Sequence, residues 1–112
     1  LPILGRGVVV HMNTVVHPDV TVGDNTVLSY NVSVTHSTHI GKNCYLAFGV
    51  MLGAYTIVED FVFIGIGAIV ISGKVDSIGT FASVGAGAVV TKSVASYECV
   101  AGNPAKFIKT LK

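Results

Sequence analysis

The sequence is dominated by an aliphatic residue that recurs at every sixth position. The unbroken part of this series is Leu4, Val10, Val16, Val22, Leu28, Val34, Ile40, Leu46, Leu52, Val58, Ile64 and Val70. It resumes two residues late at Ile78, Val84 and Val90, which indicates a short insertion near Ser72 to Ser77. A period of six matches neither an amphipathic α-helix nor an alternating strand. The chain therefore repeats one small structural unit along its length.

Two further series keep the same period. Four positions after each aliphatic residue the chain holds a small or β-branched residue: Val8, Thr14, Val20, Thr26, Val32, Thr38, Cys44, Val50, Thr56, Val62, Ala68, Ala82, Ala88 and Val94. The position before it often holds a residue that tolerates a left-handed turn: Gly7, Asn13, Asp19, Asn25, Asn31, Asn43, Gly49, Gly67 and Gly87. A short strand and a tight turn, three times per coil, explain all three series. The pattern predicts a parallel β-helix with three flat faces, an aliphatic interior and small corner residues.

Three hexads make one coil, so residues eighteen apart are expected to stack about 4.8 Å from each other, the ordinary spacing of strands. About five coils then form a prism roughly 24 Å tall, whose ends need capping. We expect one β-helical domain over residues 1–95. Residues 96–112 leave the repeat and form a C-terminal extension that covers one end or reaches a neighbour.

Composition limits the partners. The chain has 112 residues, which fits one domain, and it is 51% hydrophobic but only 12% charged, so part of its apolar surface is expected to face a partner subunit. A net charge of +1 gives no reason to expect nucleic acid or a membrane surface as a partner. No apolar run reaches the roughly 18 residues that a membrane span needs. Cys44 and Cys99 are expected to be free thiols, which favours a cytoplasmic protein.

Several hexads read aliphatic-Gly-x-x-small-x, and they are Val22-Gly23, Ile40-Gly41, Ile64-Gly65, Ile78-Gly79 and Val84-Gly85. Over residues 4–95 this pattern resembles the hexapeptide-repeat acyltransferases, and residues 100–106 match the ending shared by many of them. The resemblance implies left-handed coils, acetyl-CoA as the acyl donor without a metal ion, and a homotrimer that binds this donor between subunits.

One histidine stands in a recognisable context. Residues 32–41, with His36 in the middle, resemble the active-site rung of the sialic acid O-acetyltransferase and UDP-4-amino-sugar N-acetyltransferase group. The resemblance implies that His36 is the general base that takes the proton of a sugar hydroxyl or amine, a task that imidazole suits because it titrates near working pH. His11 and His17 are expected to be exposed or structural, and His39, which directly precedes Ile40 at a strand start, is expected to lie outside the site.

The residue after His36 departs from the family pattern. Relatives usually place Glu or Asp there to orient the imidazole, and this chain has Ser37. Asp19 stacks next to Ser37 on the adjacent coil, so its carboxylate could accept the Nδ1 proton of His36, directly or through Ser37. The alternative is that Asp19 is only a turn residue, because the same corner position elsewhere holds asparagines.

Two residues are expected near the acetyl group. Ala54 stacks one coil beyond His36, where a main-chain N–H could stabilise the oxyanion, as the resemblance also implies. Tyr45 stands nine residues after His36, where some relatives carry a second histidine, and it offers a hydroxyl there.

The pantetheine arm and the phosphates of acetyl-CoA would need a more extended binding surface than the acetyl group. Phe48, Ile66 and Ala86 stack along one line of the prism, which could hold the pantetheine arm or pack as an apolar ladder against a neighbouring subunit. The resemblance implies that the glycine-rich coil before the tail also contacts this arm, and that Lys92 and Lys106 reach the phosphates.

Two other functions fit the same fold. A γ-type carbonic anhydrase would need two histidines five residues apart and a third from another coil, whereas the neighbouring histidines here are six and three apart. A non-catalytic trimeric β-helical module would carry its histidines incidentally. Metal content and acetyl-CoA binding distinguish these alternatives from an acetyltransferase.

Overall fold

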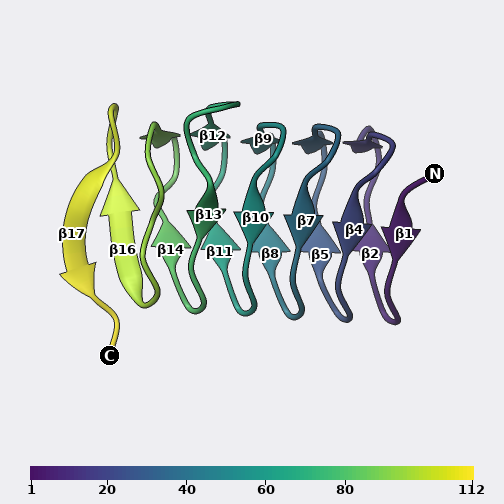
Figure 1. Ribbon diagram of the computed structural model, residues 1–112, viewed down its shortest axis with the longest axis horizontal. Helices are drawn as coiled ribbons and strands as arrows, with labels where there is room; N and C mark the ends of the chain where they lie inside the picture. The colour runs from purple at the N-terminus through teal and green to yellow at the C-terminus, as the bar shows by residue number, and fades with distance from the viewer.

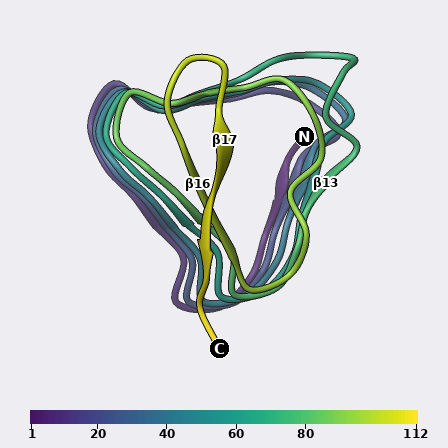
Figure 2. The same ribbon diagram turned by 90° about the vertical axis from the view of Figure 1, so that its left-hand side faces the viewer.

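The computed structural model describes residues 1–112 and confirms an all-β, left-handed parallel β-helix of five coils (Figures 1 and 2). The coils stack along the longest dimension of a molecule measuring 35 × 24 × 22 Å. Viewed end-on in Figure 2, the coils superimpose as a triangle. The chain contains no helix long and apolar enough to cross a membrane.

Three sheets form the faces of the prism. Sheet A contains β1 (Ile3–Leu4), β4 (Thr21–Val22), β7 (His39–Ile40), β10 (Ile57–Val58) and β13 (Ser77–Ile78). Sheet B contains β2 (Val9–Val10), β5 (Val27–Leu28), β8 (Tyr45–Leu46), β11 (Phe63–Ile64), β14 (Ser83–Val84), β16 (Glu98–Ala101) and β17 (Lys106–Thr110). Sheet C contains β3 (Val15–Val16), β6 (Ser33–Val34), β9 (Met51–Leu52), β12 (Ile69–Val70) and β15 (Val89–Val90).

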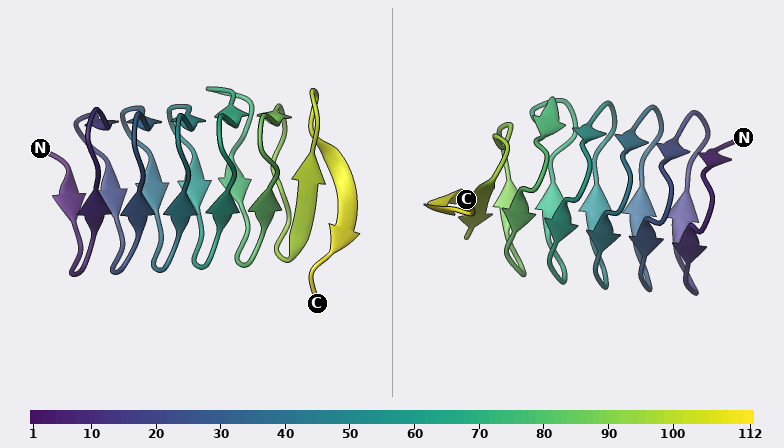
Figure 3. Two further views of the ribbon diagram at one scale, coloured as in Figure 1. Left: turned by 180° about the vertical axis from the view of Figure 1, so that it is seen from behind. Right: turned by 90° about the horizontal axis from the view of Figure 1, so that it is seen from below.

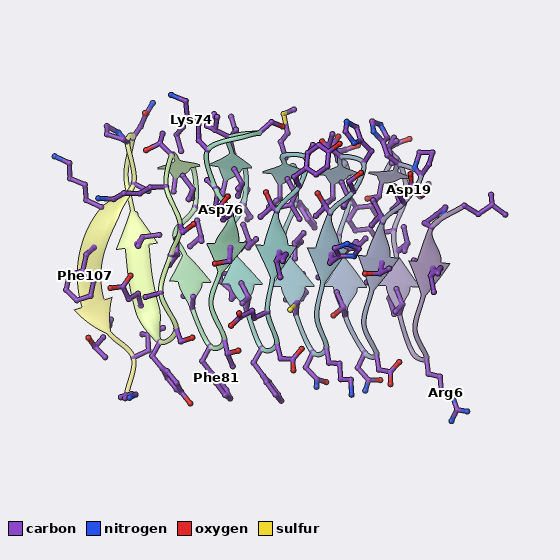
Figure 4. All side chains as sticks on the ribbon, viewed as in Figure 1. Arg6, Asp19, Lys74, Asp76, Phe81 and Phe107 are labelled. Carbon is purple, nitrogen blue, oxygen red and sulfur yellow. The ribbon has the colours of Figure 1, made fainter.

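The register is the one that the six-residue period predicts. Parallel neighbours pair eighteen residues apart, as in Val15 with Ser33 and Ser33 with Met51. The offset becomes twenty where Ile57 pairs with Ser77, which confirms the two-residue insertion. The extra residues form an outward excursion between β12 and β13, visible in Figures 2 and 3 and carrying the exposed Lys74 labelled in Figure 4.

The interior consists of the predicted aliphatic series. From Val22 to Val90 each of its members is at most 3% exposed, so every coil contributes three aliphatic side chains to one continuous core. In the first coil, Leu4 and Val10 remain 47% and 40% exposed because no further coil covers them. The aliphatic residues thus stabilise the fold by stacking on their neighbours, as in other solenoids.

The small residues of the second series fill the corners. Thr26, Thr38 and Thr56 are completely buried, and each hydroxyl donates to a carbonyl of the next coil. No buried side-chain nitrogen or oxygen lacks a hydrogen-bond partner. All nine predicted turn residues have a positive φ, as shown by 60° at Asp19 and 61° at Asn25. Each corner is therefore a left-handed turn closed by a buried small residue.

The chain continues past the last coil as a hairpin. β16 adds to sheet B parallel to β14, and β17 returns antiparallel to β16. Figure 2 shows this hairpin crossing the end of the prism. Ala105 donates from its main chain to the Val89 carbonyl at 2.8 Å, which fixes the turn of the hairpin to the last coil.

Candidate active site

Four turns stacked between sheets C and A form the corner that carries the predicted base. These turns, residues 17–19, 35–37, 53–55 and 71–73, are here called the C–A corner. In Figure 4 this corner runs along the upper edge, where Asp19 is labelled, and the corner between sheets A and B runs along the lower edge, where Phe81 is labelled. His36, Ser37, Asp19 and Ala54 all lie on the C–A corner, so the structure brings these four predicted site residues together.

His36 is exposed between β6 and β7. Its Nδ1 lies 3.3 Å from Ser37 Oγ, and its ring meets the Tyr55 ring edge to face, with centroids 5.4 Å apart at 89°. The turn beneath it is fixed by Thr38, whose buried hydroxyl donates to the Gly53 carbonyl at 2.9 Å. A rigid turn thus holds an exposed imidazole whose Nε2 faces no protein partner, as a general base requires.

Asp19 stacks on Ser37 as the coil arithmetic predicts. Both residues adopt the left-handed turn conformation, with φ of 60° at Asp19 and 59° at Ser37. No hydrogen bond or ion pair joins the Asp19 carboxylate to Ser37 or His36. The only polar side chain bonded to the imidazole is therefore the Ser37 hydroxyl.

The main-chain donors at this corner have a distinctive arrangement. The Ala54 N–H donates to Ser72 Oγ at 2.8 Å, so the predicted oxyanion donor already has a partner. The N–H groups of Ser37 and Tyr55 donate to no protein group. At the other two corners the equivalent N–H bonds to the preceding coil, as Asn43 does to Asp24 and Gly49 to Tyr30. Unpaired N–H groups beside His36 are available to a carbonyl or an oxyanion.

The residues expected to bind the donor lie on different faces and corners of the molecule. Lys92 follows β15 at the far end of the C–A corner, so it shares an edge with His36. Ile66 and Ala86 lie on the corner between sheets B and C, and Lys106 follows at its end, paired with Ala101. Tyr45 points outward from sheet B, where its ring stacks on Phe63 at 5.9 Å. The full width of sheet C separates His36 from the apolar ladder of residues 48, 66 and 86.

His36 lies outside both surface hollows of the molecule. The larger hollow, of about 350 Å³, lies over sheet A and includes His39, Ile57 and Thr80. The smaller, of about 150 Å³, lies under the C-terminal hairpin and includes Lys92 and Phe107. His36 therefore stands on an open corner of the molecule, outside either hollow.

The remaining histidines are dispersed. His11 stacks on Tyr30 at 4.6 Å at the B–C corner, whereas the His39 Nδ1 lies 2.6 Å from Thr21 Oγ1 on sheet A. His17 is exposed on the C–A corner, one coil before Thr35. No group of three His, Cys, Asp or Glu side chains converges in a way that could hold a metal ion.

Sequence reasoning missed two residues at this corner. Ser72 and Tyr55 stack next to Ala54 and Ser37 by the eighteen-residue rule, so their nearness could have been predicted. Their contacts with the Ala54 N–H and the His36 ring could not, because these depend on turn geometry and side-chain rotamers.

Known proteins share both the repeat and the fold. The family described as bacterial transferase hexapeptide (six repeats) matches residues 2–36. UDP-3-O-acylglucosamine N-acyltransferase of Caulobacter sp. (strain K31) is 36% identical over 120 residues, which cover 97% of this chain and 34% of the relative. The chain spans less than half the length of the sequence relatives that it matches.

Two solved structures extend the comparison. The acetyltransferase domain of PglB from Neisseria gonorrhoeae FA1090, in complex with acetyl coenzyme A, gives a TM-score of 0.92 at 28% identity, covering 96% of this chain and 51% of that one. The polySia specific acetyltransferase NeuO gives a TM-score of 0.77 at 26% identity, covering 98% and 71%. The repeat, the coil geometry and these likenesses agree: the chain is a hexapeptide-repeat left-handed β-helix protein, of the type to which these acyl- and acetyltransferases belong.

Proposed function

We propose that this protein transfers an acetyl group from acetyl-CoA to a hydroxyl or amine of a sugar, with His36 as the general base. The observation that carries the proposal is an exposed imidazole on a rigid corner of a fold that matches an acetyltransferase domain in complex with acetyl-CoA. The sugar acceptor is supported by the relatives, one of which is named as an N-acyltransferase of an acylglucosamine nucleotide and another as a polySia acetyltransferase.

The residues of the C–A corner suit the proton transfers. If His36 Nδ1 donates to Ser37 Oγ, Nε2 carries the lone pair and can take the proton of the acceptor hydroxyl or amine. Acetyl-CoA supplies the acetyl group as a thioester, which the acceptor attacks directly. His36 then holds the proton that the departing thiolate of CoA needs, so no covalent intermediate on the protein is required.

The developing oxyanion needs a donor close to His36. The free N–H groups of Ser37 and Tyr55 are available, and the Ala54 N–H becomes available if it leaves Ser72 Oγ. Exchange of one hydrogen-bond partner for another costs little compared with leaving an amide unpaired. We assign oxyanion stabilisation to this group of amides, with Ala54 as the donor nearest in the stacked row.

The proposal includes a homotrimer. A threefold arrangement would set the C–A corner of one protomer against the corner between sheets B and C of the next, so His36 would face Ile66 and Ala86 across the interface. Apolar side chains exposed on the three sheets, such as Met51, Phe63 and Ile57, support burial between subunits. In this arrangement Lys92 and Lys106 would approach the CoA phosphates from the C-terminal ends of the two corners.

An acceptor screen tests the function. The purified protein is incubated with acetyl-CoA and either sialic acid or a nucleotide-linked 4-amino sugar, and free CoA thiol is followed over time. Acceptor-dependent release of the thiol is the expected result. Binding of acetyl-CoA in calorimetry without transfer to any sugar would shift the proposal to another acceptor class. No binding at all would favour a non-catalytic β-helical module.

A further inference from the structure

Tyr55 has an unusual backbone conformation next to the proposed base. Its φ is +60°, a left-handed conformation that bulky side chains rarely adopt, and the residue is 69% exposed. The residues that share its place in the stacked row are Asp19, Ser37 and Gly73, whose short or absent side chains suit such a turn. Because Tyr55 is exposed, burial of its ring contributes little free energy to offset the backbone strain. The presence of an aromatic residue at this position therefore needs another explanation.

The other aromatic residues with positive φ show what such rings usually do here. Phe61, Phe81 and Tyr97 occupy one row of the A–B corner and stack in parallel, with centroids 4.7 and 5.2 Å apart and angles of 4° and 17°. Their strain is offset by contact within their own row. Tyr55 has no aromatic neighbour in its row, and its only ring contact is with His36, at 5.4 Å and 89°.

His36 needs an orienting partner. The Ser37 hydroxyl lies 3.3 Å from Nδ1, which is long for a hydrogen bond, and no carboxylate contacts the ring. An edge-to-face neighbour restricts rotation of an exposed imidazole, because the aromatic quadrupole favours one relative orientation of the two rings. We propose that Tyr55 is a positioning residue, which holds the His36 imidazole with Nε2 directed toward the acceptor. This inference rests on the proposed function of His36.

The central test is Tyr55→Asn. Asparagine tolerates positive φ and occupies the equivalent turn position at the other two corners, so this variant removes the ring and relieves the strain. We expect the melting temperature to be equal to or above that of the parent. We expect kcat to fall roughly tenfold, while KM for acetyl-CoA stays within about twofold, since only the orientation of the base is lost. Tyr55→Phe keeps the ring and is expected to keep kcat.

Phe61→Asn is the matched control. It also replaces an aromatic residue by asparagine at a φ of 60°, in the same coil, but at the corner away from His36. We expect its melting temperature to change because the aromatic stack is broken, and its kcat to stay within about twofold of the parent. An equal loss of kcat in both variants would overturn the proposal, because it would trace the effect to the fold. Parent-like kcat in Tyr55→Asn would overturn it as well.

A second measurement separates this inference from the proposed function. The imidazole resonances of His36 are recorded by NMR in the protein without substrates, for the parent, Tyr55→Asn and Phe61→Asn. We expect Tyr55→Asn alone to shift these resonances, because a ring at this distance changes the local field. Unchanged His36 resonances in Tyr55→Asn would contradict the contact even if the parent transfers acetyl groups. A parent without transfer activity would contradict the proposed function, while the resonances would still report on the ring pair.

Discussion

The main-chain N–H of Ala54 donates to Ser72 Oγ at 2.8 Å, one coil further along the C–A corner. This hydroxyl therefore accepts from the amide that we propose as an oxyanion donor. We predict that Ser72→Ala raises kcat/KM for acetyl-CoA by about three- to tenfold, because a competing hydrogen bond of ordinary strength is removed. Steady-state kinetics with varied acetyl-CoA measure the effect.

Ser93→Ala is the control for this change. Ser93 Oγ likewise accepts main-chain N–H groups, from Asp76 at 3.1 Å and Ser77 at 3.2 Å, but it lies away from His36. We expect this variant to leave kcat/KM unchanged. If Ser72→Ala instead lowers the rate, the Ser72 hydroxyl is needed to hold the turn, and the Ala54 amide is not the oxyanion donor.

Loss of the base should separate binding from chemistry. We predict that His36→Ala folds, binds acetyl-CoA with the affinity of the parent, and transfers the acetyl group about 10²- to 10⁴-fold more slowly, the usual cost of removing a general base. Calorimetry and thiol release measure the two properties. His17→Ala, on the same corner one coil earlier, should have parental activity. Unchanged turnover in His36→Ala would remove this residue from the mechanism.

The role of Asp19 can be tested without disturbing its turn. Asp19→Asn keeps the positive φ and the shape of the side chain but removes the charge. The structure shows no hydrogen bond between this carboxylate and the imidazole, so we predict turnover within about twofold of the parent, less than about 0.5 kcal/mol. A large loss of turnover with an unchanged melting temperature would indicate that substrate binding brings Asp19 and His36 together.

A site built from two protomers predicts complementation. His36→Ala removes the base from one face of the interface, and Ile66→Asp disrupts the apolar ladder on the other. Each variant alone should be inactive, but an equal mixture that exchanges subunits should regain about a quarter of the parental activity, because that share of interfaces has both faces intact. Sedimentation of the parent should give three times the chain mass of 11.6 kDa. A monomer at micromolar concentration would contradict the trimer.

The two cysteines should differ in reactivity. Cys44 is 2% exposed, its thiol donates to the Glu59 carbonyl at 3.0 Å, and burial raises its pKa above the ordinary 9.0. The fold therefore favours the neutral thiol, so the free energy of unfolding should fall as the pH rises above that ordinary value. We predict that iodoacetamide at pH 8 modifies the half-buried Cys99 and leaves Cys44 unmodified until the protein unfolds, as mass spectrometry can show. Equal labelling of both in the folded protein would contradict this.

The period of the sequence determined most of the fold. Aliphatic residues at every sixth position can all be buried together only inside a coil built from six-residue units. The coil, the register and the insertion after Val70 therefore follow from the spacing alone. Gly, Asn and Asp at the corner positions also predicted the turns, because few other residue types tolerate a left-handed conformation. Tyr55, Phe61, Phe81 and Tyr97 adopt the same turn against their intrinsic preference, and only the stacked coils impose it.

For the candidate site, too, the sequence determined one part and the tertiary structure decided the rest. The eighteen-residue spacing of the coils places His36, Ser37, Asp19 and Ala54 on one corner from the sequence alone. The sequence could not decide which groups form hydrogen bonds there, because a shift of about 1 Å in a turn moves an amide from one acceptor to another. The tertiary structure decided that Ala54 bonds to Ser72, that the amides of Ser37 and Tyr55 remain free, and that the Tyr55 ring meets His36. It also placed Tyr45 on the face of sheet B, and Ile66 and Ala86 on the corner between sheets B and C, so that none of them lies on the corner of His36.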